Sequence, residues 1–116
     1  MVHMTLNEYQ EKATGTADYG LDGQEYTVLG LVNEAGEVAG VVKKYIRGDY
    51  DNPDDEGQAY KTMREKLAKE LGDVFWYLAT CASEFGYTLE EIAQMNLDKL
   101  ADRKERGVIK GNGDER

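Results

Sequence analysis

The sequence predicts an all-α protein, and three observations support this class. The 116 residues include a single proline, Pro53, and few stretches alternate β-branched and polar residues as a half-buried strand requires. Apolar residues instead recur at the three- and four-residue spacing of amphipathic helices. Capping residues and glycines divide the chain into four such segments. We therefore expect a four-helix-bundle-type fold in one domain, residues 1–116, which is near the commonest domain size.

The first two helices have recognisable start and stop signals. Thr5 and Glu8 have the spacing of a capping box and open a first helix that continues to about Thr16. The segment ADYGLDG then predicts a connection rich in turns. A second helix is expected over about residues 24–47, and it ends at Gly48.

The second half of the chain is divided in the same way. The acidic segment GDYDNPDDEG predicts an exposed loop, after which a third helix is expected over about residues 58–85. Thr88 and Glu91 form a second capping box and open a fourth helix that continues to about residue 106 and ends at Gly107. The tail VIKGNGDER has the composition of a frayed end, and whether it belongs to a site or to an interface is open.

Composition and charge exclude several classes of protein. The formal net charge is -9, from 23 acidic against 14 basic residues, whereas binding to nucleic acid phosphates needs a basic face. No apolar run approaches the roughly 20 residues that cross a bilayer, and the N-terminus lacks the features of a signal peptide. We therefore expect a cytoplasmic protein that binds neither nucleic acid nor membrane. The single cysteine excludes an internal disulfide and a cysteine-based zinc site.

Two of the predicted helices carry pairs of acids three positions apart in apolar runs, LVNEAGEVAG (residues 31–40) and ELGDVFWYLA (residues 70–79). At about 100° per residue, Glu34 falls inside the apolar stripe that we expect the second helix to bury, and Glu37 falls at its edge. Glu70 and Asp73 take the same relative positions on the third helix. The two helices are therefore expected to direct four carboxylates toward a shared interior.

Four carboxylates in one interior repel one another and raise each other's pKa unless a cation compensates their charge. Every candidate ligand atom is an oxygen, and the single histidine, His3, lies far from both pairs in sequence. Oxygen ligands favour Mg²⁺, with Mn²⁺ as a substitute, over zinc or the Glu-x-x-His di-iron sites of helical bundles. The alternative is that the acids are surface residues paired with nearby lysines, namely Lys43, Lys44, Lys66 or Lys69.

The predicted fourth helix carries the opposite charge. One face, formed by Leu89, Ile92, Asn96, Lys99 and Arg103, begins apolar and becomes cationic toward its C-terminal half. If that half faces the carboxylates, it would hold the phosphates of a polyphosphate, since arginine binds phosphate oxygens in bidentate fashion. The alternative is an exposed helix end, where cations are favoured by the helix dipole.

A second strip of apolar and small residues lies away from the acids on both central helices. It comprises Leu29, Val32, Gly36 and Gly40 on the second helix and Gly72, Phe75, Trp76 and Ala79 on the third. A four-helix domain of this size can cover only one of the two faces itself. We therefore expect a homo-oligomer, a dimer or a tetramer, with two-fold symmetry as the simplest arrangement.

These residues resemble the motif set of the MazG-like nucleoside triphosphate pyrophosphohydrolases, in the all-α NTP pyrophosphatase superfamily. The family's Glu-x-x-Glu is met by Glu34-Ala35-Gly36-Glu37, its Glu-x-x-Asp by Glu70-Leu71-Gly72-Asp73, and its Asn-x-x-Lys by Asn96-Leu97-Asp98-Lys99, with Arg103 beyond. The ordered set spans most of the chain, whereas a lone Glu-x-x-Glu is common on any helix. Many members carry a further acid directly before the first motif, where this chain has Asn33.

The resemblance implies a metal-dependent hydrolase that cleaves a (d)NTP between its α and β phosphates, giving (d)NMP and pyrophosphate, in house-cleaning or control of the nucleotide pool. It implies that Glu34, Glu37, Glu70 and Asp73 hold Mg²⁺, and that Asn96, Lys99 and Arg103 contact the substrate. In the mechanism that we expect, Glu37 is the first choice for the carboxylate that takes or orients the proton of the attacking water.

Other functions remain open on the sequence alone. A non-catalytic acidic bundle, as a scaffold or a mimic of nucleic acid, predicts acids on the outer faces and no metal dependence. A family member that binds nucleotide or metal without turnover is a further alternative. The preferred base is not readable: Tyr9, Gln10, Tyr26, Trp76 and Tyr77 are candidates for base contacts, but aromatic residues at helical spacing more often belong to a core or an interface.

Overall fold

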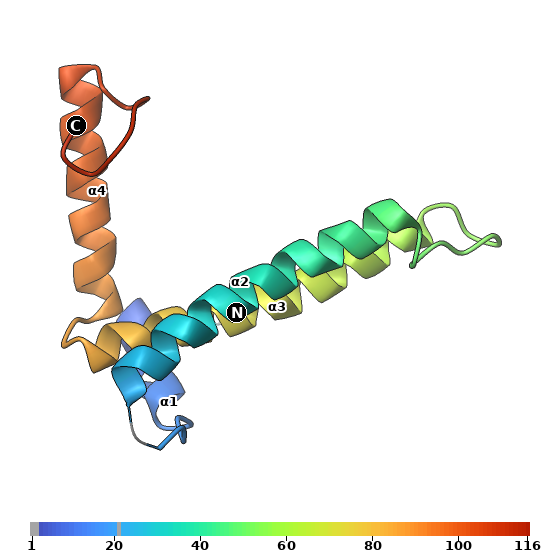
Figure 1. The fold of residues 1–116 in the computed structure, drawn as a ribbon, viewed down its shortest axis with the longest axis horizontal. Coiled ribbons are helices and arrows are strands. Elements are labelled where there is room, and N and C mark those ends of the chain that lie inside the picture. The colour runs from blue at the N-terminus through green and yellow to red at the C-terminus, as the bar shows by residue number, and fades with distance from the viewer. Residues whose placement is uncertain (1–2, 21) are drawn as a thin grey trace.

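A computed structural model describes residues 3–20 and 22–116, and these residues contain four α-helices and no strand. The helices are α1 (Leu6–Thr14), α2 (Gly23–Arg47), α3 (Gln58–Glu84) and α4 (Leu89–Arg106). The two long helices, α2 and α3, form an antiparallel hairpin, and α4 leaves one end of it at a steep angle (Figure 1). The all-α class is thus confirmed, and the helix ends lie within about two residues of those expected.

The helix ends use the signals present in the sequence. Thr88 and Glu91 form a complete capping box at the start of α4. At α1, the Thr5 hydroxyl accepts a hydrogen bond of 3.0 Å from the Glu8 N–H. Gly48 closes α2 with a φ of 89°, and Gly107 closes α4 with a φ of 73°. Glycine adopts this left-handed conformation without the steric penalty that a Cβ would bring.

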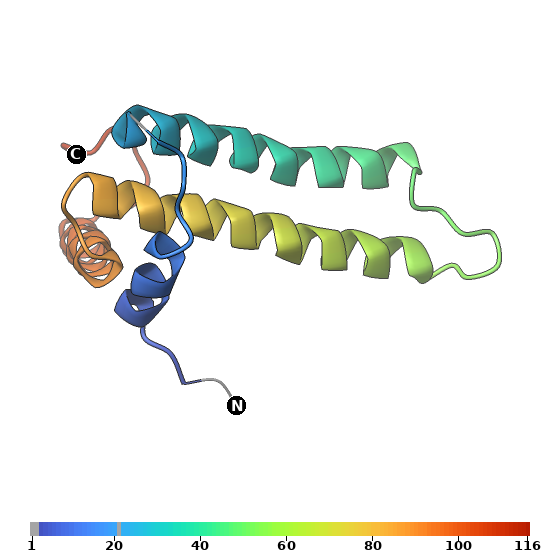
Figure 2. The ribbon, with the colours of Figure 1, turned by 90° about the horizontal axis from the view of Figure 1, so that it is seen from below.

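The α2–α3 hairpin is held together by close packing along its length, while α1 packs against α3 and, less extensively, against α4 (Figure 2). Near the end of the hairpin that carries α1, the Tyr77 ring of α3 packs onto the backbone of α2 at Gly30. A Cβ at position 30 would collide with that ring. Glycine is therefore required there for the two helices to approach.

The core lies where α1, α3 and the start of α4 meet. It consists of Ala13, Ala79, Ala82 and Leu89, with Tyr9, Phe75, Trp76 and Ile92 packed against it. The buried Gln10 side chain ties these elements together: it donates to the carbonyls of Ala79 at 3.2 Å and Tyr87 at 2.9 Å, and it accepts from the Leu89 N–H at 2.8 Å. These bonds fix the turn from which α4 projects.

Much of the apolar surface expected to be buried is exposed in the single chain. Leu29 and Val32 on the outer face of α2 are 69% and 66% exposed, and Ile46, in the stripe that carries the acids, is 81% exposed. One of the two apolar faces was expected to need a partner subunit, and Leu29 and Val32 lie on that face. The burial expected for the stripe that carries the acids is incomplete at Ile46, because a two-helix hairpin encloses only the line along which its helices touch. None of the helices that the structure describes has the length and apolar character that a membrane span requires.

Candidate metal centre and cationic helix

Three of the four predicted acids come together across the hairpin. Glu34 on α2 and Glu70 and Asp73 on α3 each place a carboxylate oxygen so that the three oxygens lie within 4.8 Å of one another. The helical spacing of three residues sets Glu70 and Asp73 one turn apart on the same face of α3, and the packing of α2 places Glu34 opposite them. We call this group the acid cluster.

The described residues form no ion pair that compensates the charges of the acid cluster. Burial, followed by the negative charges of Asp73, Glu70 and Glu37, raises the pKa of the Glu34 carboxyl above its usual value. Within residues 3–20 and 22–116, neither the cluster nor Glu37 takes part in an ion pair with lysine or arginine. The alternative of acids paired with neighbouring lysines is therefore not what the described residues adopt.

The cluster fits a hard divalent cation better than any other common ion. Its donors are carboxylate oxygens alone, the set that Mg²⁺, Ca²⁺ and Mn²⁺ prefer. If Glu34, Glu70 and Asp73 held Mg²⁺, the ion would keep further positions for water and for substrate oxygens, as is usual at sites that bind phosphates. Burial first, and then the neighbouring acids, raise the pKa of Glu34, and a bound cation would offset both effects by favouring the carboxylate form.

Glu37 is not a member of the three-residue acid cluster. It lies one turn further along α2 and is exposed. With Glu70 it lines a hollow of about 210 Å³ whose wall also holds Lys44, Lys66 and Lys69. Glu37 is therefore next to the acid cluster, facing a space that contains cationic side chains, instead of facing the three carboxylates directly.

The cationic half of α4 presents the other predicted residues. Asn96 and Lys99 line a shallow hollow of about 260 Å³ together with Ile92 and Met95. Arg103, one turn beyond Lys99, is only 4% exposed. Both cations bind one carboxylate of the C-terminal tail: Asp114 Oδ1 lies 3.0 Å from Lys99 Nζ and 3.3 Å from Arg103 Nη2.

The acid cluster and the cationic half of α4 do not meet within one chain. Helix α4 packs against α1 and the end of α3 and makes no contact with α2 among the described residues. It points away from the hairpin, and its cationic half is the part farthest from the α3–α4 turn (Figure 1). The chain alone therefore brings together three acids, but not the acids with Asn96, Lys99 and Arg103.

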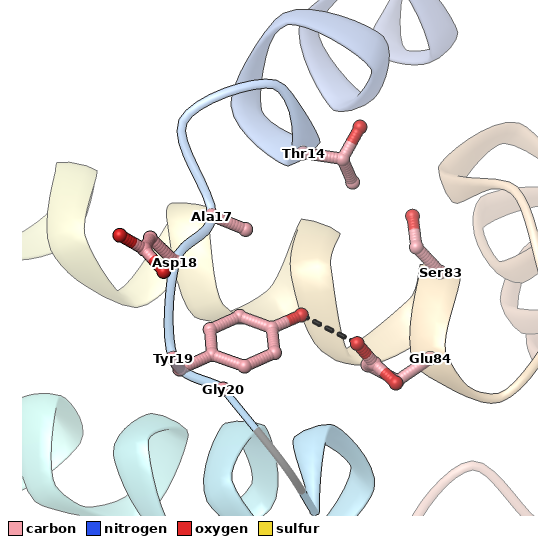
Figure 3. A pocket seen from close by; sticks show the side chains of 7 residues that line it. All are labelled: Thr14, Ala17, Asp18, Tyr19, Gly20, Ser83 and Glu84. Atoms are coloured by element: carbon pink, nitrogen blue, oxygen red, sulfur yellow. Dashed lines mark hydrogen bonds between the residues drawn. The ribbon is translucent and has the colours of Figure 1, made fainter.

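A larger hollow, of about 530 Å³, lies between the α1–α2 connection and the end of α3. Figure 3 shows Tyr19 crossing it toward Glu84, whose carboxylate accepts a 2.6 Å hydrogen bond from the tyrosine hydroxyl. Burial and this bond raise the pKa of Tyr19 to about 12. The Tyr19 ring stacks on Tyr26, with 5.2 Å between ring centroids, and Tyr26 lies against Tyr77.

The structure gives several candidates for base contacts a role in the fold. Gln10 is buried, and its amide bonds to backbone groups and to the Ser83 hydroxyl. Tyr9 stacks on Phe75 with 4.6 Å between ring centroids, and the Trp76 indole donates to the Thr16 hydroxyl. Tyr26 remains 47% exposed although its ring stacks on Tyr19. Tyr19 and Asp114 are the residues that sequence reasoning did not single out, because both lie in segments without helical periodicity.

Comparison with known proteins identifies the class. The MazG nucleotide pyrophosphohydrolase domain matches residues 22–108, which include α2, α3 and α4 and therefore all of the predicted site residues. The chain belongs to this family. Members of the family generally hydrolyse nucleoside triphosphates and depend on divalent metal ions, in agreement with the acid cluster.

Two relatives are similar over nearly their whole lengths. The chain is 42% identical over 120 residues to the Gene 37 protein of Mycobacterium phage L5, and this alignment covers 97% of this chain and 100% of that protein. It is 33% identical over 101 residues to the uncharacterized protein YvdC of Bacillus subtilis strain 168, and this alignment covers 86% of this chain and 90% of the relative. No solved structure matches the chain.

Proposed function

We propose that the protein is a Mg²⁺-dependent nucleoside triphosphate pyrophosphohydrolase, which converts a (d)NTP to (d)NMP and pyrophosphate in house-cleaning or control of the nucleotide pool. One observation carries the proposal: three carboxylates from two helices lie within 4.8 Å of one another without an ion pair to lysine or arginine among the described residues. Such a group is costly unless it binds a cation. Its setting in a nucleotide pyrophosphohydrolase family supports this reaction.

Glu34, Glu70 and Asp73 would hold Mg²⁺, or Mn²⁺ in its place. A bound ion supplies charge neutralisation for the phosphates and a more acidic water. Glu37 is proposed as a further metal ligand and as the carboxylate that orients or takes the proton of the attacking water. Its place one turn from Glu34 supports this, since an exposed carboxylate there is close enough to the acid cluster to reach a water bound beside it.

Asn96, Lys99 and Arg103 are proposed to bind the substrate. Their amide and cationic groups lie on one face of α4, where they match the oxygens of a triphosphate. Phosphoryl transfer requires mainly positioning and neutralisation of charge, and these groups provide both. Water adds to phosphorus, the phosphoanhydride bond breaks, and pyrophosphate leaves with the electron pair of that bond.

A homo-oligomer, in which two or more copies share the site, is the arrangement that we propose in solution. Leu29 and Val32 form an exposed apolar strip on α2, and such a strip is usually covered by a partner surface. The apolar stripe that carries Glu34 is also only partly covered within one chain, as the exposure of Ile46 shows. A second hairpin packed on the first would complete a four-helix bundle around the acid cluster. It would also offer a route by which α4 of one subunit reaches the acid cluster of another, since α4 cannot do so within its own chain.

The competing function is a non-catalytic acidic bundle that binds nucleotide or metal, or acts as an interaction protein. A charge mimic displays its acids on the outside, and this chain does carry exposed acids in the 49–56 loop. However, Glu34 and Glu70 are partly buried, and a mimic gives no reason for burying them. Binding without turnover is distinguished from catalysis only by assay.

The test is product analysis with purified protein against a panel of NTPs and dNTPs at on the order of millimolar Mg²⁺. We expect monophosphate and pyrophosphate in equal amounts, and no products when EDTA removes the metal. Orthophosphate without pyrophosphate would show that a different bond is cut, and no turnover of any nucleotide would favour the binding function instead.

A further inference from the structure

The C-terminal tail, residues 108–116, folds back along the cationic half of α4 (Figure 1). Its principal contact is the Asp114 carboxylate, whose Oδ1 atom accepts from both Lys99 at 3.0 Å and Arg103 at 3.3 Å. The backbone carbonyl of Asp114 accepts from the same Arg103 nitrogen at 3.1 Å. The tail therefore covers the two cations that we assign to phosphate binding.

The tail is held in this position by its own arginine. Arg116 donates from Nε to the Val108 carbonyl and from Nη2 to the Ile109 carbonyl, each at 3.1 Å, and so closes the segment into a loop. Gly113, with a φ of 79°, supplies the left-handed residue that the loop needs just before Asp114. The tail is thus an ordered loop, although its composition is typical of a frayed end.

The tail does not satisfy Arg103 fully. The Arg103 side chain is 5% exposed, and its Nε atom is buried without a hydrogen-bond acceptor among the described residues. All of its bonds to the tail come from Nη2. A guanidinium binds anions best through two N–H groups at once, and a phosphate presents enough oxygens to bind in that way. The buried, unpaired Nε therefore indicates a better ligand than the tail.

We propose that Asp114 occupies the place of a substrate phosphate on Lys99 and Arg103, so that the tail is a gate which a triphosphate displaces when it binds. The proposal rests on the proposed function, because that function assigns the two cations to phosphate. Carboxylate and phosphate oxygens are alike as acceptors for these donors. Asp114 brings one oxygen shared between two cations, whereas a phosphate brings several.

The closed gate is weak enough to open. The Asp114 side chain is 79% exposed, and ion pairs open to water contribute little because solvent screens them. The contacts to Lys99 and Arg103 lower the pKa of the Asp114 carboxyl, so the carboxylate is ionised at neutral pH and competes with phosphate there. The gate thus lowers the apparent affinity for a polyphosphate by the fraction of time that it is closed.

The experiment measures binding of inorganic tripolyphosphate to the full chain at low ionic strength without divalent ions. The variants are Asp114→Asn and a matched control, Glu115→Gln, which removes the same charge from the adjacent residue; Glu115 makes no ion pair among the described residues. We expect Asp114→Asn to bind about three- to tenfold more tightly than the wild type, and Glu115→Gln to bind within about twofold of it. Equal or weaker binding by Asp114→Asn would overturn the proposal and make Asp114 a residue that positions Lys99 and Arg103.

A second readout follows the tail itself. Trypsin cleaves after Lys110, which lies in the loop, and mass spectrometry follows the rate of this cut. Tripolyphosphate should accelerate the cut in the wild type, because displacement frees the loop, and a slower or unchanged rate would contradict displacement. Neither readout uses nucleotide turnover, so a chain that fails to hydrolyse NTPs would disprove the proposed function, whereas an active chain that fails both binding tests would disprove the gate alone.

Discussion

The α2–α3 hairpin and helix α4 place their functional residues in different ways. In the hairpin, two packed helices bring Glu34, Glu70 and Asp73 within 4.8 Å of one another without help from other elements. Helix α4 holds its cations on a single helix that projects away from the hairpin. Among the described residues, the ionic partner of Lys99 and Arg103 is Asp114 in the tail of the same chain. One chain therefore builds the acid cluster, but it does not build the complete proposed site.

The difference shows what each half of the site depends on. The acid cluster depends on contacts between α2 and α3, so it should persist in a monomer and respond to metal alone. The cations depend on whatever brings α4 to a hairpin, which in our proposal is a second subunit. Changes in the two regions should therefore have separable effects on metal binding, on substrate affinity and on assembly.

The largest effect on turnover is expected when a carboxylate of the acid cluster is removed. Glu70→Gln should lower turnover by at least about 1,000-fold, because the lost carboxylate is a metal ligand and the metal neutralises the phosphates. Folding should be intact, and the melting temperature equal to or above that of the wild type, because one of the repelling charges is removed. Glu65→Gln, an exposed acid on the same helix, is the control. Near-normal rates in Glu70→Gln would refute the acid assignment.

The link between the two regions is tested by the exposed face of α2. Val32→Asp places a charge on a residue that is 66% exposed in the single chain, and it should convert the oligomer to a monomer in analytical ultracentrifugation. Turnover should fall by about 100-fold if α4 reaches the acid cluster only across the subunit boundary, since misplacement of binding groups has effects of this size. Lys43→Gln changes the charge of α2 equally and should remain oligomeric. A variant that is monomeric and fully active would contradict the shared site.

Removal of a cation from α4 should have a smaller effect on catalysis. Lys99→Gln should raise KM for the triphosphate about tenfold with a lesser change in kcat, which is the pattern expected when a group binds substrate and transition state alike. Lys104→Gln, on the same helix and exposed, controls for the loss of one positive charge. A large fall in kcat at unchanged KM would instead move Lys99 into the chemical step.

The smallest effect concerns the pH dependence of stability. Burial and the neighbouring acids raise the pKa of Glu34 above its usual value near 4.5. Below that pH the carboxyl is protonated in both the folded and the unfolded state. As the pH rises through the higher folded value, the folded state carries a charge that it disfavours, and the free energy of unfolding falls.

This cost should disappear in Glu34→Gln. Thermal melts should show the variant a few degrees more stable than the wild type at pH 7, with no such gain at pH 4. Added Mg²⁺ should raise the melting temperature of the wild type more than that of the variant. A gain that is the same at both pH values would indicate that repulsion within the acid cluster is not its cause.

The sequence was sufficient for the helices and for the grouping of three acids, because both follow from helical periodicity. Glu34, Glu70 and Asp73 lie together because residues three apart share a face and two apolar stripes pack face to face. Periodicity also shows which face of a helix is apolar, but not how many partners cover it. The exposure of Ile46, in the stripe that carries the acids, could therefore not be predicted from the pattern.

Contacts made by irregular segments could not be predicted from the sequence pattern. The ion pairs of Asp114 depend on the C-terminal tail, a glycine-containing loop with no repeating pattern. The hydrogen bond from Tyr19 to Glu84 depends in the same way on the irregular connection between α1 and α2. Gln10 was one of several candidates for contacts to a base, and the structure shows that the turn into α4 uses its amide instead. The side chains that join separate elements are those that a helical wheel cannot place.

The central claim is that the acid cluster holds a divalent ion, and a Mn²⁺ titration of the wild type and of Glu70→Gln tests it most directly. Calorimetry, with free Mn²⁺ followed by electron paramagnetic resonance, measures binding without nucleotide and without turnover. We expect at least one Mn²⁺ per wild-type chain and a loss of affinity of about tenfold or more in Glu70→Gln, because a ligand of the ion is removed. Equal stoichiometry and affinity in the two proteins would contradict the account, because the ion would then be bound elsewhere.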